Sequence, residues 1–161
     1  MKPMKSRVED AAALFLSGYN CCQSTFVPYA EQLGMGREQA LKLSCSLGGG
    51  MGRMREVCGA VSGMALIAGL VCGNTDPHNQ EAKTKNYETV RKMAEEFKKQ
   101  HQTIICREIL GLQEAEKSAA PSERTPEYYK ARPCVRMVET AAKIIEETFP
   151  EVFMENEGNK S

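Results

Sequence analysis

The chain has 161 residues, with 21 basic residues balanced by 21 acidic ones, seven cysteines, no tryptophan and few other aromatic residues. This length suits one domain that can bury a core without help from disulfides or metals. Zero net charge gives no field that would draw the protein to nucleic acid or to an anionic membrane, and the shortage of aromatic rings leaves little for stacking bases.

The odd number of cysteines cannot form a closed disulfide framework. Glu9 and Asp10 interrupt the apolar start of the chain, so this start does not resemble a secretory signal. The uncharged run at 57–72 is shorter than the roughly 18–20 residues that span a bilayer, so we expect no stable membrane insertion. We therefore expect a reducing cytoplasm, in which cysteines are thiols, metal ligands or transient redox partners.

Three helices are predicted in the first 47 residues. They cover 5–17, about 21–33 and about 37–47, and the first has an inner face of Val8, Ala11, Ala12, Phe15 and Leu16. Gly18 is a natural end for the first helix. Asn20 and Gln23 have the spacing of a capping box, so the second helix should begin with Cys21 and Cys22 in its first turn. Pro28 is expected to kink it.

The stretch at 48–73 is the least polar part of the chain. It opens with a glycine loop at 48–52 and then predicts a central helix over about 53–72, which is too apolar for the surface. Small residues four apart let another backbone or a prosthetic group approach closely. We expect this face mainly to pack helices, and the candidates for cofactor contact are Gly59, Gly63, Gly50 and Gly52. The glycine loop has no preceding strand and no Walker lysine, so it does not favour nucleotide binding.

The second half is more polar. A long helix is predicted over about 79–110, with a break near His101 and Cys106 in its last turns. Residues 112–130 are expected to form an exposed loop, and Pro133 to open a last helix beside Cys134. The fold should thus be all-α, a single-domain bundle of about six helices around the glycine-rich central helix, covering 1–153, with a flexible tail at 154–161. The long helix and the loop offer contact surface for a homodimer.

Several cysteines fall at predicted helix N-termini, where free N–H groups and the helix dipole stabilise a thiolate. These are Cys21 and Cys22, Cys58 and Cys134, with Arg53 and Arg55 expected near Cys58 and Arg132 and Arg136 flanking Cys134. Of the adjacent pair, one cysteine should face a site and the other should pack. Cys45 and Cys72 fit the role of small buried apolar residues, and His78 and His101 that of surface residues. With no C-x-x-C, no local zinc or cluster motif is present.

One ordered set of motifs covers about residues 8–145. It consists of Asn20-Cys21-x-Gln23, the run from Gly48 to Met54, Cys58-Gly-Ala-x-x-Gly63, Cys106-Arg-Glu-x-Leu-Gly111 and Cys134. This combination resembles the C-GCAxxG-C-C family of redox-active proteins, whose members are small and largely helical. The resemblance implies that Cys21, Cys58, Cys106 and Cys134 converge on one redox site, with Cys22, Cys45 and Cys72 as additions.

Two hypotheses follow. In the first, the four cysteines form an electron-transfer site, either as ligands of an iron–sulfur cluster or as a dithiol/disulfide couple, with Cys58 as the central member. The protein would then be an oxidoreductase, or an electron-transfer accessory to one that serves a redox partner protein. In the second, the same cysteines bind zinc or a similar thiophilic metal without redox turnover. The remaining alternative is a metal-free structural bundle in which the cysteines serve only as packing residues.

Overall fold

The computed structural model describes residues 6–112 and 117–154. The helices in these residues are α1 (Val8–Leu16), α2 (Cys21–Gln32), α3 (Arg37–Cys45), α4 (Gly59–Cys72), α5 (Gln80–His101), α6 (Cys106–Ile109), α7 (Pro126–Ala131), α8 (Cys134–Thr148) and α9 (Pro150–Phe153). Within the same ranges, β-pairing is limited to one antiparallel bridge between Val57 and Ile105. The predicted all-α fold is confirmed, and three short helices, α6, α7 and α9, raise the number above the six expected.

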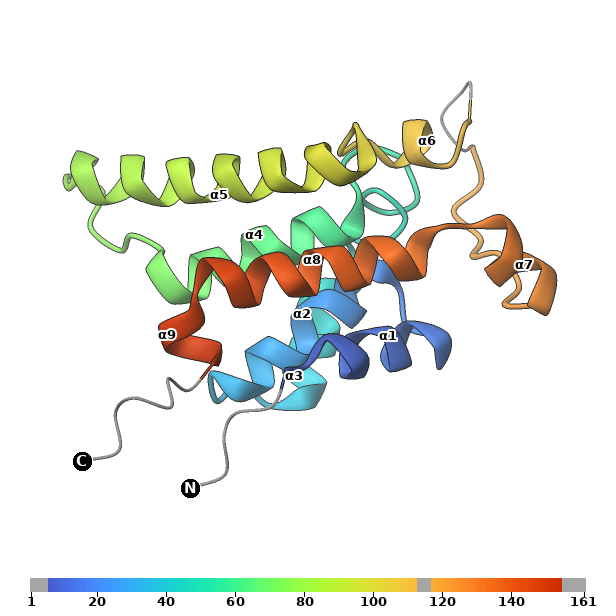
Figure 1. Ribbon diagram of the computed structural model, residues 1–161, viewed down its shortest axis with the longest axis horizontal. Coiled ribbons are helices and arrows are strands. Elements are labelled where there is room, and N and C mark those ends of the chain that lie inside the picture. Colours follow the sequence, from blue (N-terminus) through green and yellow to red (C-terminus); the bar gives the residue numbers. More distant parts are fainter. Residues whose placement is uncertain (1–5, 113–116, 155–161) are drawn as a thin grey trace.

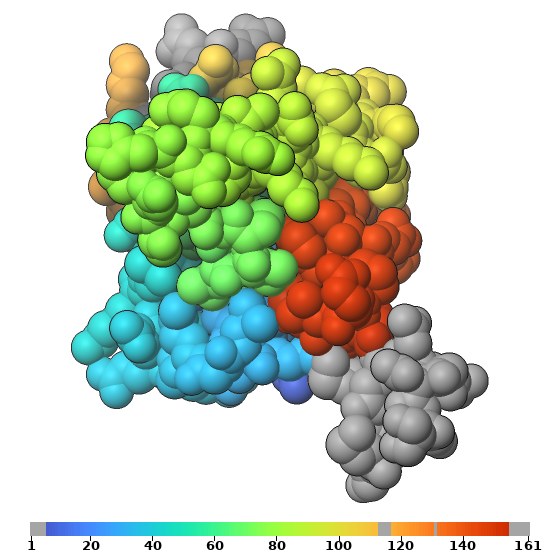
Figure 2. Space-filling view, turned by 90° about the vertical axis from the view of Figure 1, so that its left-hand side faces the viewer, coloured from blue at the N-terminus to red at the C-terminus, as the bar shows by residue number. Residues whose placement is uncertain are grey.

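The helices are arranged in three layers (Figure 1). The long helix α5 lies on one side, α4 and α8 run next to each other in the middle, and α1, α2 and α3 cover the opposite side (Figures 1 and 2). Helix α4 contacts α2, α5 and α8, as expected for a central helix. The expected central position of the glycine-rich helix α4 is therefore confirmed, and α2 and α8 pack directly against it.

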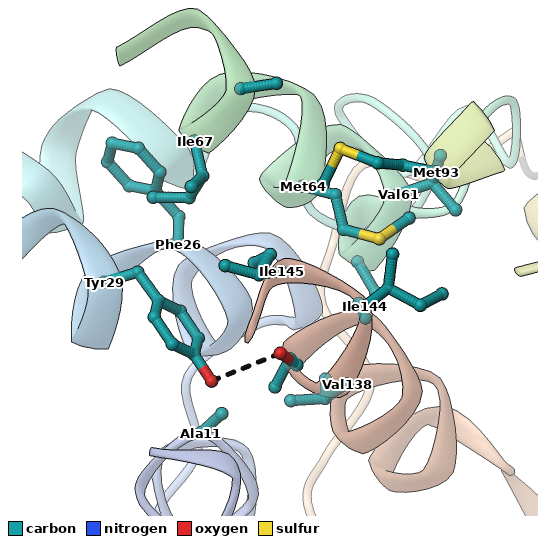
Figure 3. Packing of buried hydrophobic residues seen from close by; sticks show 14 of the residues in the cluster. Ala11, Phe26, Tyr29, Val61, Met64, Ile67, Met93, Val138, Ile144 and Ile145 are labelled. Carbon is teal, nitrogen blue, oxygen red and sulfur yellow. Dashed lines mark hydrogen bonds between the residues drawn. The ribbon is translucent and has the colours of Figure 1, made fainter. Parts of the chain in front are cut away.

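The core is built from large apolar side chains of the three layers (Figure 3). Phe26 and Tyr29 of α2, Met64 and Ile67 of α4 and Ile145 of α8 are almost completely buried. Burial of side chains this size stabilises the fold by roughly 1.5–3 kcal/mol each. Of the inner face predicted for the last helix, Val138, Ala141, Ala142, Ile145 and Phe149 are buried, and Val135 is half-buried against the core. One position of the inner face predicted for the first helix was wrong, because Leu16 is 55% exposed.

One polar network lies within this core. The hydroxyl of Tyr29 donates a hydrogen bond of 2.5 Å to Oε2 of Glu146 in α8. The same carboxylate oxygen accepts hydrogen bonds from Ser6 Oγ at 3.2 Å and from the backbone N–H of Arg7 at 2.9 Å. A single buried carboxylate thus joins α2, α8 and the chain just before α1.

The central helix begins at Gly59, six residues later than predicted. Residues 49–53 and Arg55 all have positive φ, a left-handed conformation that cannot continue a right-handed helix. Hydrogen bonds within the segment, such as Arg55 N–H to Gly49 O at 3.1 Å, hold it in place. The predicted single helix over 53–72 is therefore wrong for its first turn and a half.

The long polar helix ends at His101, and Gln102 adopts the left-handed conformation with φ 70°. The predicted break is confirmed, so Cys106 begins the short helix α6 and does not lie near the end of a long one.

His101 is half-buried, and its Nε2 hydrogen-bonds Thr140 Oγ1 at 2.8 Å, so the surface position expected for it is wrong. The expected loop at 112–130 contains α7, whose first turn is capped by the hydroxyl of Thr125. Of the predicted tail, 155–161 lies outside the described residues.

Candidate functional site

Four cysteines from distant parts of the chain meet at one end of the bundle. Cys21, Cys106 and Cys134 are the first residues of α2, α6 and α8, and Cys58 is the N-cap of α4. All four line one cavity of about 380 Å³, together with Cys45. The convergence expected from the sequence is therefore found, at a point where several helices present their positively polarised N-termini.

Backbone hydrogen bonds fix Cys58 and Cys106 on neighbouring segments. The N–H of Cys58 donates to the carbonyl of Ile104 at 2.7 Å, and the N–H of Cys106 donates to Glu56 at 2.6 Å. The glycine loop lies against this pairing, since a Cβ on Gly50 would come within 2.7 Å of the Cβ of Cys106. The left-handed loop thus has a structural role, which is to bring the starts of α4 and α6 together.

Cys21 and Cys58 form a hydrogen-bonded thiol pair. The Cys58 thiol donates to the sulfur of Cys21, which also accepts from the backbone N–H groups of Gly49 and Gly59. These donors outweigh the effect of burial and lower the pKa of Cys21 to about 6. The same hydrogen bond, together with burial, raises the pKa of Cys58 well above its ordinary value.

This asymmetry corrects one expectation. A lowered pKa was expected for Cys58, as for the other cysteines at helix N-termini, with Arg53 and Arg55 nearby. The acidic thiol is Cys21, whereas Arg55 donates from Nη1 to the sulfur of Cys106 at 3.7 Å and Arg53 donates to Ser118 O and Ser122 Oγ. Cys58 is therefore the donor that sustains a thiolate, and its position is still central.

Gly59 makes room for the sulfur of Cys21. A Cβ at position 59 would come within 2.5 Å of Cys21 Sγ and 3.0 Å of the N–H nitrogen of Cys22. One helical turn further, a Cβ at position 63 would come within 2.9 Å of the Cβ of Thr25. Both glycines thus lie where α4 meets α2, as expected for a packing face. Gly52 lines the cavity, and the role of Gly59, Gly63, Gly50 and Gly52 as cofactor contacts stays a prediction.

The two remaining family cysteines are protonated neighbours of the pair. Burial raises the pKa of Cys106, and the nearby Arg55 opposes this in part. Burial also raises the pKa of Cys134 to about 12, although this residue begins a helix and lies close to Arg132. The expectation that a helix N-terminus lowers the pKa of Cys134 is therefore wrong, because desolvation outweighs the dipole.

The three additional cysteines have different positions. Cys22 is fully buried and its pKa is raised by burial, so in the adjacent pair it is Cys21 that faces the site. Cys72 is half-buried and donates to the Ala68 carbonyl at 3.2 Å, far along α4 from the cavity. Cys45 was expected to pack but is exposed and lines the cavity. Its place in the sequence, three residues before the glycine loop, is the signal that could have identified it.

The thiols that line the cavity are of the kind that binds a thiophilic metal, but they are not arranged as the ligands of one metal ion. Across 6–112 and 117–154, no three His, Cys, Asp or Glu side chains are grouped closely enough to hold one metal ion. The cysteines are instead arranged as one hydrogen-bonded pair with further thiols around it. The four-cysteine ligand set, the iron–sulfur cluster and zinc stay predictions.

A family model described as "Putative redox-active protein (C_GCAxxG_C_C)" matches residues 19–148. The chain belongs to this family. The C_GCAxxG_C_C match begins just before Cys21 and ends in α8, so it includes the glycine loop and all the cysteines around the cavity. Comparison with curated proteins and with solved structures finds no match.

The C_GCAxxG_C_C motif can now be related to the geometry. The four cysteines that the sequence resemblance singles out lie at the four helix starts around the cavity, and Gly59 and Gly63 are the positions where α4 approaches α2. No helix in the described parts of the chain has both the length and the apolar content needed to cross a bilayer. The family resemblance stated from the sequence is confirmed. At the level of the family, the match indicates a redox role for the cysteines.

Proposed function

We propose that this protein is a thiol–disulfide redox protein whose working pair is Cys21 and Cys58. The observation that carries the proposal is the pairing of the Cys21 and Cys58 thiols at the wall of one cavity. Thiol–disulfide exchange requires a thiolate that attacks and a second thiol close enough to resolve the mixed disulfide. Half-buried Cys21 is suited to attack, and Cys58, which is only 5% exposed, is suited to resolve.

The reaction can be written with these two sulfurs. The Cys21 thiolate attacks one sulfur of a substrate disulfide, a Cys21–substrate disulfide forms, and the other substrate sulfur leaves as a thiolate. That thiolate takes the proton of Cys58, and the Cys58 thiolate then attacks Cys21. A Cys21–Cys58 disulfide closes and the second substrate sulfur is released, so two electrons have passed to the substrate. A dithiol on a redox partner protein restores the pair by the reverse exchange.

Thiol counting with peptide mapping tests this proposal. Reduced protein, treated with a small disulfide and then alkylated, should lose two titratable thiols and yield a Cys21–Cys58 cross-linked peptide. Cys72→Ser is the matched control, because Cys72 lies away from the cavity and a serine can keep its hydrogen bond to Ala68. It should leave the loss of two thiols unchanged, whereas Cys21→Ser and Cys58→Ser should abolish the internal disulfide. Closure of a different pair in the wild type would contradict the assignment.

An iron–sulfur cluster or zinc on Cys21, Cys58, Cys106 and Cys134 is the second candidate. It is favoured by the convergence of the four cysteines on one cavity and disfavoured by their pairwise arrangement. Protein purified without oxygen and without chelators distinguishes the candidates. Stoichiometric iron with acid-labile sulfide, or stoichiometric zinc, lost in Cys58→Ser and kept in Cys72→Ser, would replace the dithiol proposal.

A further inference from the structure

The cavity next to Cys21 has a positively charged lining. Among the described residues that line it there is no Asp or Glu, and its charged lining consists of Arg53, Arg55, Arg124 and Arg132. The rest of the lining includes apolar and aromatic side chains, namely Phe15, Ile109, Leu110, Tyr128 and Met137. The protein as a whole has no net charge, so this positive lining is a local feature.

Two of these arginines are held in place by neutral groups. Arg124 donates to the carbonyls of Phe15 and Tyr19, at 3.3 and 3.1 Å, and its guanidinium lies 4.5 Å from the centre of the Phe15 ring. Arg132 lies 4.8 Å from the centre of the Tyr128 ring and contacts Ser122 Oγ at 3.5 Å. None of these partners carries a negative charge. They orient the guanidinium groups and leave their positive field in the cavity.

We propose that the cavity binds a small organic disulfide that carries negative charge, such as a dicarboxylate disulfide. This inference rests on the proposed function and specifies the substrate of the same site. Guanidinium groups bind carboxylates well, because two parallel N–H donors match the two carboxylate oxygens. An anionic disulfide would be drawn to the arginines with its sulfur–sulfur bond in reach of Cys21, and exchange would then follow the steps already given.

The size and lining of the cavity favour an organic anion over an inorganic one. A volume of about 380 Å³ falls within the usual range of small-ligand pockets, about 300–1,000 Å³, and exceeds what a single tetrahedral oxyanion needs. An inorganic oxyanion would leave the apolar part of the lining without a partner. A disulfide with short carbon chains has apolar atoms for Phe15 and Met137 and charged ends for the arginines.

Three probe disulfides of similar size test the charge preference. Dithiodiglycolate carries two negative charges, bis(2-hydroxyethyl) disulfide is neutral, and cystamine carries two positive charges. The rate at which each oxidises the reduced protein is divided by its rate with dithiothreitol in the same buffer, which removes the intrinsic reactivity of each disulfide. We expect the corrected rate to be at least about tenfold higher for the dianion than for the dication at low salt, since electrostatic focusing in a cleft raises rates by about 10–10³. The difference should shrink at high salt.

Arg132→Gln should remove a large part of this preference, and Arg132→Lys should restore most of it, because lysine keeps the charge. Arg91→Gln is the matched control, since Arg91 is exposed on α5 and does not line the cavity. It should leave the preference unchanged. Equal corrected rates for the three probes, or a preference that Arg132→Gln leaves intact, would overturn the charge proposal while the dithiol function stands. If none of the probes closes the Cys21–Cys58 disulfide, the proposed function itself fails.

Discussion

Cys58 donates its thiol hydrogen to Cys21, and this single bond divides the roles of the two residues. It stabilises negative charge on Cys21 and makes loss of the proton from Cys58 harder. Because the thiolate is the nucleophile in exchange, the direction of attack is set by which sulfur receives the bond. Two cysteines far apart in the chain thus become an ordered pair.

The pH dependence of alkylation tests this relationship. The pKa of Cys21 is lowered to about 6, so its reactive fraction should rise with pH, with a midpoint near 6, and be nearly complete at pH 8. Cys58→Ala removes the thiol donor and should move the midpoint upward, towards the ordinary cysteine value. Cys58→Ser keeps an O–H donor and should move it less. Rates of iodoacetamide labelling at Cys21, followed by mass spectrometry, measure these midpoints. A midpoint that stays near 6 in Cys58→Ala would show that the bond does not control the pKa.

The same shift predicts how stability responds to pH. A thiol whose pKa is lowered in the folded protein stabilises the fold at pH above its unfolded pKa, and this contribution fades as pH falls through the folded value. For Cys21 the window runs from about 9 down to about 6. The difference in free energy of unfolding between wild type and Cys21→Ser, measured in urea, should therefore shrink as pH falls through this window. A difference that grows towards low pH would contradict the assignment.

The glycines of α4 offer a matched stability test. A Cβ at Gly59 or Gly63 would meet α2 at 2.5 and 2.9 Å, whereas one at Gly69 would meet nothing within 4 Å. Gly59→Ala and Gly63→Ala should lower the free energy of unfolding by roughly 1–3 kcal/mol, because overpacking displaces backbone or side chains. Gly69→Ala should raise it by about 0.5–1 kcal/mol, because alanine favours the helix. Urea unfolding measures all three, and equal effects at Gly59 and Gly69 would rule out close packing as the reason for the motif.

Features of this site could be predicted from the sequence where the interacting residues lie close together in the chain. The Asn20–Gln23 capping box was found because both partners lie within one helical turn, and it correctly placed Cys21 at the start of α2. The start of α4 was misplaced because apolar periodicity does not reveal that residues 49–53 turn left-handed. The family motifs then indicated which four cysteines meet.

Contacts between distant segments could not be predicted from the sequence. Nothing local shows that Arg124, in an expected loop, packs on Phe15 of α1, or that Cys45 opens onto the same cavity as Cys134. The acidity of Cys21 likewise depends on three donors from other segments, Cys58, Gly49 and Gly59. Helix N-termini alone predicted lower pKa values at Cys58 and Cys134, whereas the hydrogen bond with Cys21 and burial raise the pKa of Cys58, and burial raises the pKa of Cys134.

The left-handed loop contains a non-glycine residue that can be relieved of strain. Met51 has φ 67° and is 52% exposed. A left-handed conformation costs a non-glycine residue roughly 1–2 kcal/mol, so Met51→Gly should stabilise the protein by about 1 kcal/mol. Met54, 47% exposed and outside the positive-φ set, is the control. Met54→Gly should cost about 0.5–1 kcal/mol through the added freedom of the unfolded chain. Thermal and urea unfolding compare the two, and destabilisation by both would show that the loop is not left-handed at position 51.

The buried carboxylate of Glu146 predicts a coupling across the core. Tyr29→Phe removes its 2.5 Å hydrogen bond, and Glu146→Gln removes the charge that strengthens the bond. Each change should lower the free energy of unfolding by about 1–3 kcal/mol, because a hydrogen bond to a charged group contributes about that much when buried. Ser6→Ala removes a weaker 3.2 Å donor at an exposed position and should cost less than about 0.5 kcal/mol. In a double-mutant cycle, Tyr29→Phe and Glu146→Gln should couple by about 0.5–3 kcal/mol. Strict additivity would mean that the Tyr29 hydroxyl and the Glu146 carboxylate contribute to stability independently and that the bond between them adds nothing of its own.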